Sequence, residues 1–392
     1  MIVPLHKPAV AVFSTTGRRD ARPTPSRDSA TGRAVVPDGP NRTSSFKIQK
    51  LPALTSATLR LGRWIWVLTV FAGVIGHLNA QTFTTWNSAS SAAYATASNW
   101  SNGGPISSKV AQFDTVISTS GVLGISGTSI NSQSIVITNN YTGNLTLGAS
   151  GTTGSNLSYT FAGNAAIDGV SNVAISNNSS KNLTFNPTHT SGNNTLQLTF
   201  GNATNNVIRV AGSGNITINA KITGSNPISI SANSSETGLV FFTAANTYTG
   251  LTTVSTGILR VSNAAALGSN ANGTTVSIGA ALELSGGITI GAEALTLSGN
   301  GVSSGGALRN IAGDNTYQGA ITLAADTRIN SDSGNLTLDV ASGSAITGTY
   351  NLSFGGVGNI TVADAIATST GTLTKEGQGT LTLSGANTYT GT

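Results

Sequence analysis

The chain has 392 residues, of which only 8% are charged, and it contains no cysteine. An ordinary soluble domain has about 25% charged residues. The 48 glycines, together with many Ser, Thr and Asn, disfavour helices because these residues loosen the backbone or compete for its hydrogen bonds. The composition predicts an all-β, turn-rich chain. It excludes a disulfide scaffold and a Cys-ligated zinc site.

The net charge of +5 would ordinarily suggest a nucleic-acid or membrane partner. Residues 1–80, however, hold 11 Lys and Arg against 3 Asp, a balance of +8, whereas residues 81–392 hold 8 basic against 11 acidic residues, a balance of −3. The basic character therefore belongs to the N-terminal segment. If that segment is removed, the rest is weakly acidic, and we expect no nucleic-acid partner.

The N-terminal segment has two parts. Residues 1–59 are rich in Pro, Arg and Ser without periodicity, which predicts a disordered leader or an incorrectly placed start. In residues 60–80, two arginines precede the apolar stretch 64–75, which is the pattern of a secretory signal peptide. We expect cleavage between Ala80 and Gln81. A membrane anchor is the alternative, but about 15 apolar residues are fewer than the roughly 20 needed to cross a bilayer.

From residue 81 onward, short runs alternate apolar residues with Thr or Ser and begin after Gly or Asn. This period of two predicts strands with one apolar face, and the Asn and Gly predict turns between them. No window shows helical periodicity. The predicted strands that share an Asn-apolar-Thr/Ser-apolar pattern are residues 144–147, 182–185, 215–218, 335–338, 351–354 and 359–362.

A longer repeat indicates the architecture. The hexapeptide 245–250 returns at 314–319 and 386–391, and each interval between successive copies equals three units of about 23 to 24 residues. Such a period predicts a parallel β-solenoid, because stacked coils bury an apolar face that one unit cannot bury alone. About 13 coils of ~23 residues would fit residues 116–392 and the cap before them. A stack of antiparallel sandwiches and disorder are the alternatives. The repeat supplies Asn246, Tyr248, Gly250, Asn315, Tyr317, Gly319, Asn387, Tyr389 and Gly391.

Residues 371–391 resemble the autotransporter-associated β-strand repeat of large bacterial surface proteins, and residues 245–261 continue the same repeat. The resemblance implies a right-handed parallel β-helix passenger that is exported and displayed on, or shed from, a Gram-negative-type envelope. It implies no catalytic residues and no cofactor. Proteins of this family usually continue through more repeats to an anchor or sorting signal. We therefore expect a product truncated in mid repeat, with its C-terminal anchor missing.

Aromatic residues gather just after the expected cleavage point, in residues 81–115. Trp86 and Trp100 resemble the Trp-containing opening of similar exported repeat proteins. A first coil exposes apolar rows and an unpaired edge. We therefore expect Trp86, Trp100 and Phe113 to form an N-terminal cap. A sugar-binding platform of stacked aromatics is the alternative.

Catalytic and metal sites find little support in the sequence. Once residues 1–80 are gone, His189 is the sole histidine, so a Ser/His/Asp triad would depend on it. The densest acidic group is Asp326, Asp332 and Asp339 with Arg328. Solvated turn charges explain this group, and calcium binding or a catalytic carboxylate pair are the alternatives. We expect no catalytic, cofactor or metal residues.

The repeated Asn and Tyr are explained by the fold. An Asn at one corner of the coil can hydrogen-bond along a ladder, and the Tyr beside it can cover the core. We therefore expect a non-enzymatic, exported solenoid with a structural or adhesive role, and a host surface, matrix or polysaccharide as its partner. A carbohydrate-active β-helix enzyme and a passive spacer of a larger autotransporter are the alternatives.

Overall fold

The computed structural model describes residues 81–85, 101–102, 104, 108–114, 121–125, 129–188, 194–232 and 238–392. These residues all belong to one compact unit, His77–Thr392. The predicted leader, the predicted signal peptide and Ala80 lie outside the described residues, and Gln81 is the first residue inside them. In the part of the chain that is described, no helix is long and apolar enough to span a membrane.

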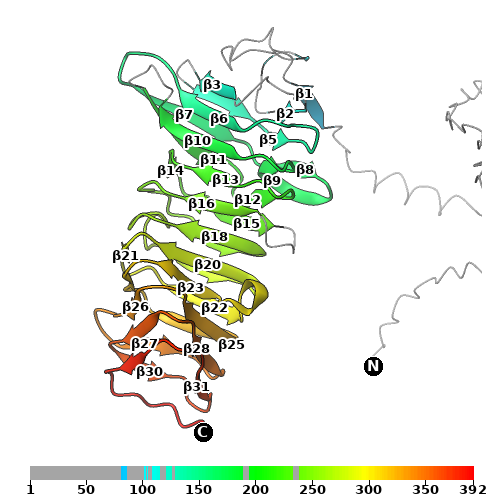
Figure 1. Ribbon diagram of the computed structural model, residues 1–392. Coiled ribbons are helices and arrows are strands. Elements are labelled where there is room, and N and C mark those ends of the chain that lie inside the picture. Colours follow the sequence, from blue (N-terminus) through cyan, green and yellow to red (C-terminus); the bar gives the residue numbers. More distant parts are fainter. Residues whose placement is uncertain are drawn as a thin grey trace, which may run out of the picture. The chain divides into compact units, whose positions relative to one another are not determined.

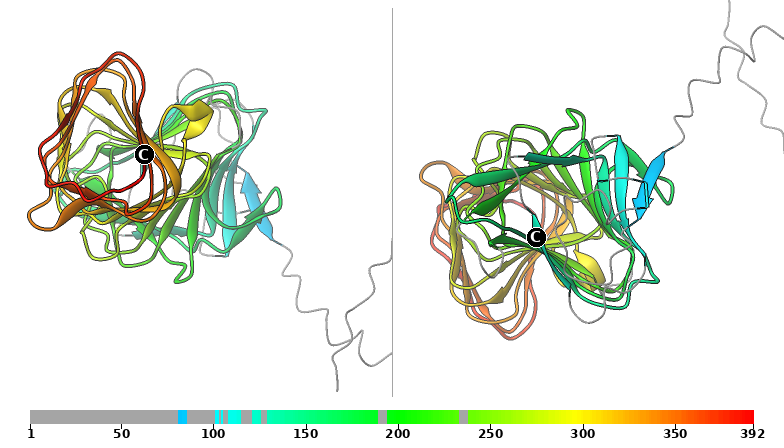
Figure 2. Two further views of the ribbon diagram at one scale, coloured as in Figure 1. Left: turned by 90° about the horizontal axis from the view of Figure 1, so that it is seen from below. Right: turned by 90° about the horizontal axis from the view of Figure 1, so that it is seen from above.

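The described chain is an all-β parallel β-solenoid of about 11 turns, which confirms the predicted fold class. Strands follow one another down the molecule in chain order, from cyan to red (Figure 1). Viewed end on, the orange and red coils of the C-terminal part overlie one another (Figure 2). A short 3-10 helix, η2 (Val302–Ser304), interrupts the strands.

Two stacks of parallel strands make up most of a 23-stranded sheet. Both stacks pass through the long strand β25, which bends between its two halves. The first stack consists of β1 (Thr82–Thr85), β2 (Lys109–Phe113), β5 (Ser134–Ile137), β9 (Val170–Asn177), β12 (Asn206–Val210), β15 (Ile228–Ala232), β17 (Thr252–Val254), β19 (Thr274–Val276), β22 (Leu295–Gly299), β25 (Ile321–Ser331), β27 (Ser344–Thr347) and β30 (Ala365–Ala367).

In each coil, the chain passes through a strand of the first stack and then through a strand of the second stack, on the next side of the coil. It consists of β3 (Gly121–Ile125), β6 (Leu145–Ala149), β10 (Leu183–Thr188), β13 (Ile216–Ile218), β16 (Leu239–Phe242), β18 (Gly257–Val261), β20 (Ala280–Ser285), β23 (Leu308–Ala312), the second half of β25, β28 (Leu352–Gly355) and β31 (Leu373–Lys375).

Two smaller sheets close the third side of the coil. The first contains β4 (Ser129–Ser132), β7 (Asn156–Phe161), β11 (Thr195–Phe200) and β14 (Lys221–Thr223). The second contains β21 (Thr289–Ile290), β24 (Asn315–Tyr317), β26 (Asn335–Leu338), β29 (Asn359–Val362) and β32 (Leu381–Leu383).

The alternating sequence explains which residues face the core. In β10, Leu183 and Phe185 are buried while Thr184 between them is half-buried, and β13 repeats the pattern in register, with Leu183 opposite Ile216. Parallel pairing therefore places apolar residues above apolar residues and Thr above Thr. All six strands predicted from the Asn-containing pattern are present, as β6, β10, β13, β26, β28 and β29.

The coils are of two lengths. Most coils are short, as when Val254 pairs with Val276 in the next coil. Two coils are longer, because Ile135 pairs with Ile175, and Ile175 with Ile208. Since these two coils take up more of the chain than a short coil does, the chain forms about 11 turns and not the predicted 13.

The two long coils have an aromatic core. The Phe161 ring packs against those of Phe200 and Tyr159 with centroids 5.4 and 4.7 Å apart, and meets Phe185 edge to face at 6.2 Å. All four side chains are buried. Large rings fill the wider cross-section that longer strands enclose. From β17 onward the core is mainly Leu, Ile, Val and Ala.

A hairpin interrupts the parallel order on the outer face of the first stack. The strand β8 (Ala165–Ile167) pairs antiparallel with β9 through the turn Asp168-Gly169, in which both residues have positive φ. This is the backbone that a two-residue hairpin turn requires. Ile167 packs there in a second, smaller apolar cluster with residues of β2, β5, β9 and β12. Asp168 also forms an ion pair of 2.8 Å with Arg209.

Candidate functional site

The Asn of each hexapeptide joins its coil to the coil before it. Its side-chain Oδ1 accepts a hydrogen bond from the backbone N–H of a buried isoleucine, a donor that the core would otherwise leave unpaired. All three donors are isoleucines of the preceding coil. The pairs are Ile222 with Asn246 (2.8 Å), Ile288 with Asn315 (2.7 Å) and Ile366 with Asn387 (2.8 Å).

The Asn amide group also donates. Asn246 Nδ2 donates to the carbonyl of Ala266 in the following coil, at 2.6 Å, and Asn315 Nδ2 donates to the carbonyl of Ala312 at 2.9 Å. Asn246 and Asn315 are buried. Each hexapeptide Asn thus bonds mainly to main-chain groups. A direct ladder between the three copies does not form, because the copies are three or more coils apart.

A side-chain ladder does exist, but it uses a different set of residues. Asn144 Oδ1 accepts the N–H of Asn182, whose Oδ1 accepts the N–H of Asn215, and Asn215 in turn accepts the N–H of Leu239. All three distances are 3.0 Å. These Asn residues directly precede β6, β10 and β13, and the sequence analysis placed them at the start of predicted strands without a bond to the next coil. Each one joins its strand to the next coil.

The hexapeptide Tyr points into the core. Tyr248 and Tyr317 are fully buried, and Tyr389 packs against the core in the last coil while remaining partly exposed. The Tyr248 hydroxyl lies 2.7 Å from Thr252 Oγ1, an inward residue at the start of β17. Burial raises the pKa of both Tyr248 and Tyr317 above the ordinary value. Both phenols are therefore neutral core residues.

The hexapeptide Gly is required by close contact between coils. A Cβ on Gly319 would lie 1.7 Å from the Glu293 carbonyl oxygen, and one on Gly250 would lie 2.1 Å from the Asn226 carbonyl oxygen. At Gly391 the carbonyl oxygen of Gly371 would be 2.4 Å away. None of the three glycines has a positive φ. Main chain packed on main chain, and not backbone conformation, excludes a side chain at these positions.

The third copy occupies another side of the coil. The first two copies come directly before β17 and β25 of the first stack. The third copy replaces the next strand of that stack, since Thr388 donates its backbone N–H to the carbonyl of Ile366 in β30. The stretch between the first two copies therefore makes three coils, as predicted. The stretch between the second and the third copy makes three coils and then continues along one more side of the next coil.

The cap residues are only partly described. Phe113 in β2 is buried in the main core and meets Tyr141 edge to face, with centroids 6.4 Å apart. β2 pairs on both sides, with β1 and with β5, as an ordinary member of the first stack. Trp86 and Trp100 lie outside the described residues, and so does His189.

The acidic group singled out in the sequence is dispersed by the fold. Asp326 accepts hydrogen bonds from the backbone N–H and Nδ2 of Asn351, at 2.9 and 3.0 Å, one coil further on. Arg328 pairs with Glu376, and Asp332 with Arg309. Over the described residues, no three His, Asp or Glu side chains come together in a way that could hold a metal ion.

Glu293 is a buried carboxylate that the sequence analysis missed. It is 4% exposed, and Thr274 Oγ1 donates to its Oε1 at 3.0 Å. No Lys or Arg of the described residues forms an ion pair with it. Burial therefore raises the pKa of Glu293 to about 7, although the Thr274 hydrogen bond works in the opposite direction.

The surroundings of Glu293 are a small pocket and two buried hydroxyls. The pocket, of about 290 Å³, is lined mostly by small residues, and Glu293 is the sole carboxylate in its lining. The hydroxyls of Ser269 and Tyr317 are buried without a hydrogen-bond partner among the described residues. In the sequence, the only sign of these buried polar groups is that Thr252 and Thr274 lie one coil apart.

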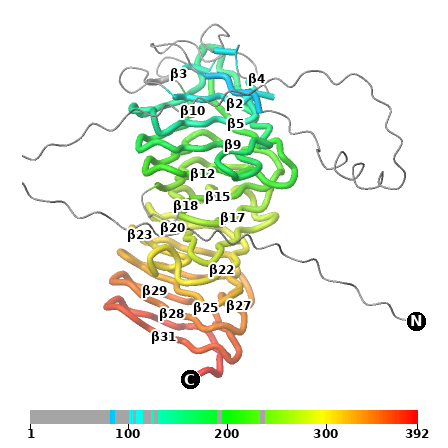
Figure 3. The backbone as a smooth tube through the Cα atoms, turned by 90° about the vertical axis from the view of Figure 1, so that its right-hand side faces the viewer, coloured from blue at the N-terminus to red at the C-terminus, as the bar shows by residue number. Residues whose placement is uncertain are grey.

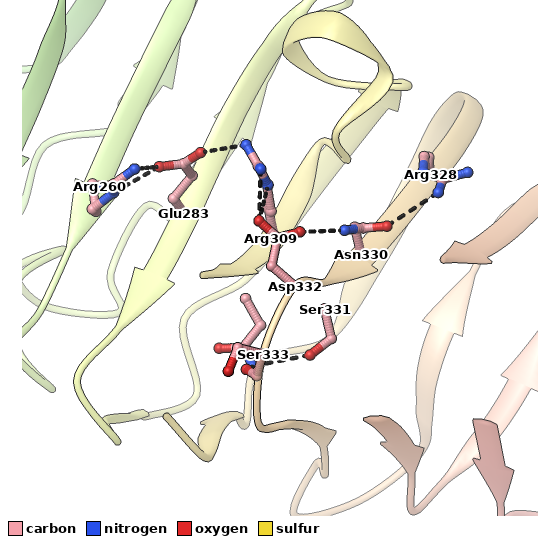
Figure 4. A network of polar contacts seen from close by, with 9 residues as sticks. Arg260, Glu283, Arg309, Arg328, Asn330, Ser331, Asp332 and Ser333 are labelled. Carbon is pink, nitrogen blue, oxygen red and sulfur yellow. Dashed lines mark hydrogen bonds and ion pairs between the residues drawn. The ribbon is translucent and has the colours of Figure 1, made fainter. Parts of the chain in front are cut away.

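A row of charges follows the outer face of the second stack (Figure 4). Glu283, whose side chain is 1% exposed, accepts from Arg260 at 2.6 Å and from Arg309 at 3.1 Å. Arg309 continues the row to Asp332 at 2.6 Å. Burial lowers the pKa of Arg309, but Asp332 and Glu283 outweigh this effect and the net change is upward. Arg260 also lies over the Phe241 ring, 5.3 Å from its centroid.

The row extends further through amides. Asn330 Nδ2 donates to Asp332 at 2.6 Å, and Arg328 donates to Asn330 Oδ1 at 3.1 Å (Figure 4). Because Arg260, Glu283 and Arg309 occupy equivalent positions of neighbouring strands, their charges alternate at one coil length. In the sequence, this row is marked only by opposite charges separated by one coil length.

Together, stacked parallel coils and inter-coil Asn, Tyr and Gly contacts define a β-solenoid of the repeat type. Residues 236–261 and 373–392 match the family model of the Passenger-associated-transport-repeat. The chain thus carries an autotransporter-associated repeat, as the resemblance implied. The two matches contain the first and third hexapeptides. No curated protein and no solved structure gives a significant match to the chain.

Proposed function

We propose that the protein is an exported, non-enzymatic autotransporter passenger that serves as a surface or shed scaffold with a structural or adhesive role. The match of its repeats to the passenger-associated family, on a parallel solenoid, carries this proposal. In such a fold the long polar sides present Thr, Ser and Asn to the surroundings. A matrix, a host surface or a polysaccharide is the partner this chemistry suits.

The carboxylates support a non-catalytic role. Hydrolysis of a glycosidic bond ordinarily needs two carboxyl groups on either side of the substrate. Glu283 and Asp332 are held by arginines, and Asp168 is held by Arg209. Glu293 has a pocket but no second carboxylate in its lining. These arrangements favour a scaffold over the alternative of a carbohydrate-active enzyme.

The proposal is tested by locating the protein on cells of its native host. Intact cells are treated with proteinase K, and the protein is followed with an antibody in the envelope, the medium and the lysate. We expect the signal on intact cells to be lost and the mature N-terminus to begin at Gln81. Protection in intact cells, with cleavage only after lysis and with the leader retained, would refute export.

A further inference from the structure

The strands β15 and β17 are neighbours on successive coils of the first stack (Figure 3). A shallow groove lies on the outer face of the stack at these strands. Its volume is about 510 Å³, and its lining comes from the turns and strands of successive coils, from residue 204 to residue 272. This volume lies within the range of small-molecule sites in proteins, about 300–1,000 Å³. The groove is distinct from the Glu293 pocket and from the charged row, because it shares no residue with either.

The lining is polar but carries no charge. It contains Ser, Thr and Asn side chains, together with Pro227 and Leu251, and no Asp, Glu, Lys or Arg. Leu251 is 38% exposed. A large exposed apolar side chain beside polar groups provides a surface against which a mixed ligand can pack.

Several polar groups in the groove lack a partner. The side chains of Asn205, Ser225 and Thr253 make no hydrogen bond within the part of the chain that the structure describes. Ser229 and Ser255, by contrast, bond to each other at 2.8 Å between their Oγ atoms. A wholly apolar ligand would remove the three free groups from water without replacing their hydrogen bonds, at a cost in affinity. An ionic ligand would find no opposite charge in the lining.

We propose that this groove binds a neutral polysaccharide. Sugar hydroxyls would pair with the free side chains of Asn205, Ser225 and Thr253, and the apolar C–H faces of the sugar rings would lie on Leu251 and Pro227. An extended polymer suits the groove because its walls repeat from coil to coil: Ser229 and Thr253 stand opposite one another on successive strands. The inference rests on the proposed adhesive function and assigns its ligand class and its site.

The test is affinity electrophoresis of the purified protein through native gels that contain a neutral polysaccharide, dextran or mannan, or an acidic one, alginate. Thr253→Glu places a charge in the groove. Thr322→Glu is the matched control, because Thr322 belongs to the same outward row three coils further on. Ser225→Trp, at an exposed turn of the groove, blocks it without changing a strand, in case Thr253→Glu does not fold.

We expect at least one neutral polysaccharide to retard the protein and Thr322→Glu equally, and the apparent affinity to fall roughly tenfold or more in Thr253→Glu and Ser225→Trp. Equal retardation of all four proteins, retardation by alginate only, or no retardation in any gel would overturn the inference. None of these outcomes bears on export, which is tested separately by protease treatment of intact cells.

Discussion

The long coils between residues 134 and 218 and the short coils after residue 238 build one solenoid in different ways. The long coils enclose a wide cross-section that four buried aromatic rings fill, and a hairpin covers their outer face. The short coils enclose mainly Leu, Ile, Val and Ala around separate rings such as Phe242, Tyr248 and Tyr317. The hexapeptide Asn and Gly join these coils to their neighbours. The difference teaches that a longer coil needs rings in contact to fill its wider cross-section, whereas Asn side chains bridge neighbouring coils of both lengths.

The family match follows the same division. Both matched segments, 236–261 and 373–392, belong to the short-coil part. The hexapeptide within them makes inter-coil contacts that depend on main chain approaching main chain. The repeat therefore marks a tightly stacked part of the short coils. The long coils also have Asn bonds and close Gly contacts, at Asn182, Gly212 and Gly214, but these residues lie outside the hexapeptide.

The largest expected effect is loss of an aromatic ring from the long coils. Phe161→Ala should lower the free energy of unfolding by about 3–5 kcal/mol, because the neighbouring rings cannot collapse into the cavity. Leu297→Ala in a short coil should cost less, about 2–3 kcal/mol. Urea unfolding followed by circular dichroism measures both. Phe83, which is 42% exposed, provides the surface control, and an equal loss in Phe83→Ala would contradict the assignment of the core.

The second-largest effect is expected at the hexapeptide glycine of the short coils. Gly319→Ala should destabilise the protein by about 3 kcal/mol, because the added Cβ meets the main chain of Glu293. Gly291→Ala is the matched control, since a Cβ there has no atom within 4 Å and its φ is not positive. Thermal melting should separate the two variants. If both melted like the unsubstituted protein, the close packing of coils at this corner would be wrong.

Removal of the corner amide should have a moderate effect. Asn315→Ala leaves the Ile288 N–H buried without its acceptor, and we expect a loss of about 2 kcal/mol. The same change at Asn387, in the partly exposed last coil, should cost about 1 kcal/mol or less. Denaturant titration of the two variants sharpens the comparison between an interior corner and a peripheral one. A larger loss of stability for Asn387→Ala than for Asn315→Ala would contradict this prediction.

The mildest expected effect is a pH dependence in the short coils. The pKa of Glu293 is raised from 4.5 to about 7 in the folded protein, so the folded state keeps a proton that the unfolded state has lost between these values. Stability should therefore fall as the pH rises from about 4.5 to about 7 and level off above. Glu293→Gln should remove this slope and be more stable at pH 8 by about 1 kcal/mol, because the neutral amide avoids the desolvation cost of the carboxylate. Melting temperatures of both proteins, measured from pH 4 to pH 8, test this prediction. If the variant kept the same slope, the pH dependence would come from groups other than Glu293.

Much of the fold could be predicted from short sequence patterns. Thr between Leu183 and Phe185, or between Leu336 and Leu338, is enough to predict a strand with one buried face, and both strands are present. Asn182 and Asn215 were expected at the start of two such strands, but their bonds to the next coil were not predicted. A turn is a local property of the chain, whereas the N–H that each Asn accepts belongs to a residue one coil away.

Features that depend on coil length could not be predicted from local sequence patterns. Glu283 meets Arg260 and Arg309 only because one complete coil separates it from each of them along the chain. Glu293 becomes buried because its coil lies among coils that carry Thr274 and Tyr317. For the same reason the third hexapeptide was expected at the same corner as the others and lies one side further along.

Local sequence was sufficient for the all-β class, the stacked coils and the burial of alternate residues, since period-two alternation and Asn or Gly turns act within a few neighbours. It was also sufficient to indicate the autotransporter-associated repeat. Three-dimensional packing alone decided the two long coils, the buried Glu293 and the partners of each charge. Which residue lies above which depends on the summed lengths of all strands and turns in a coil, and those lengths are set by how neighbouring coils fill the core between them.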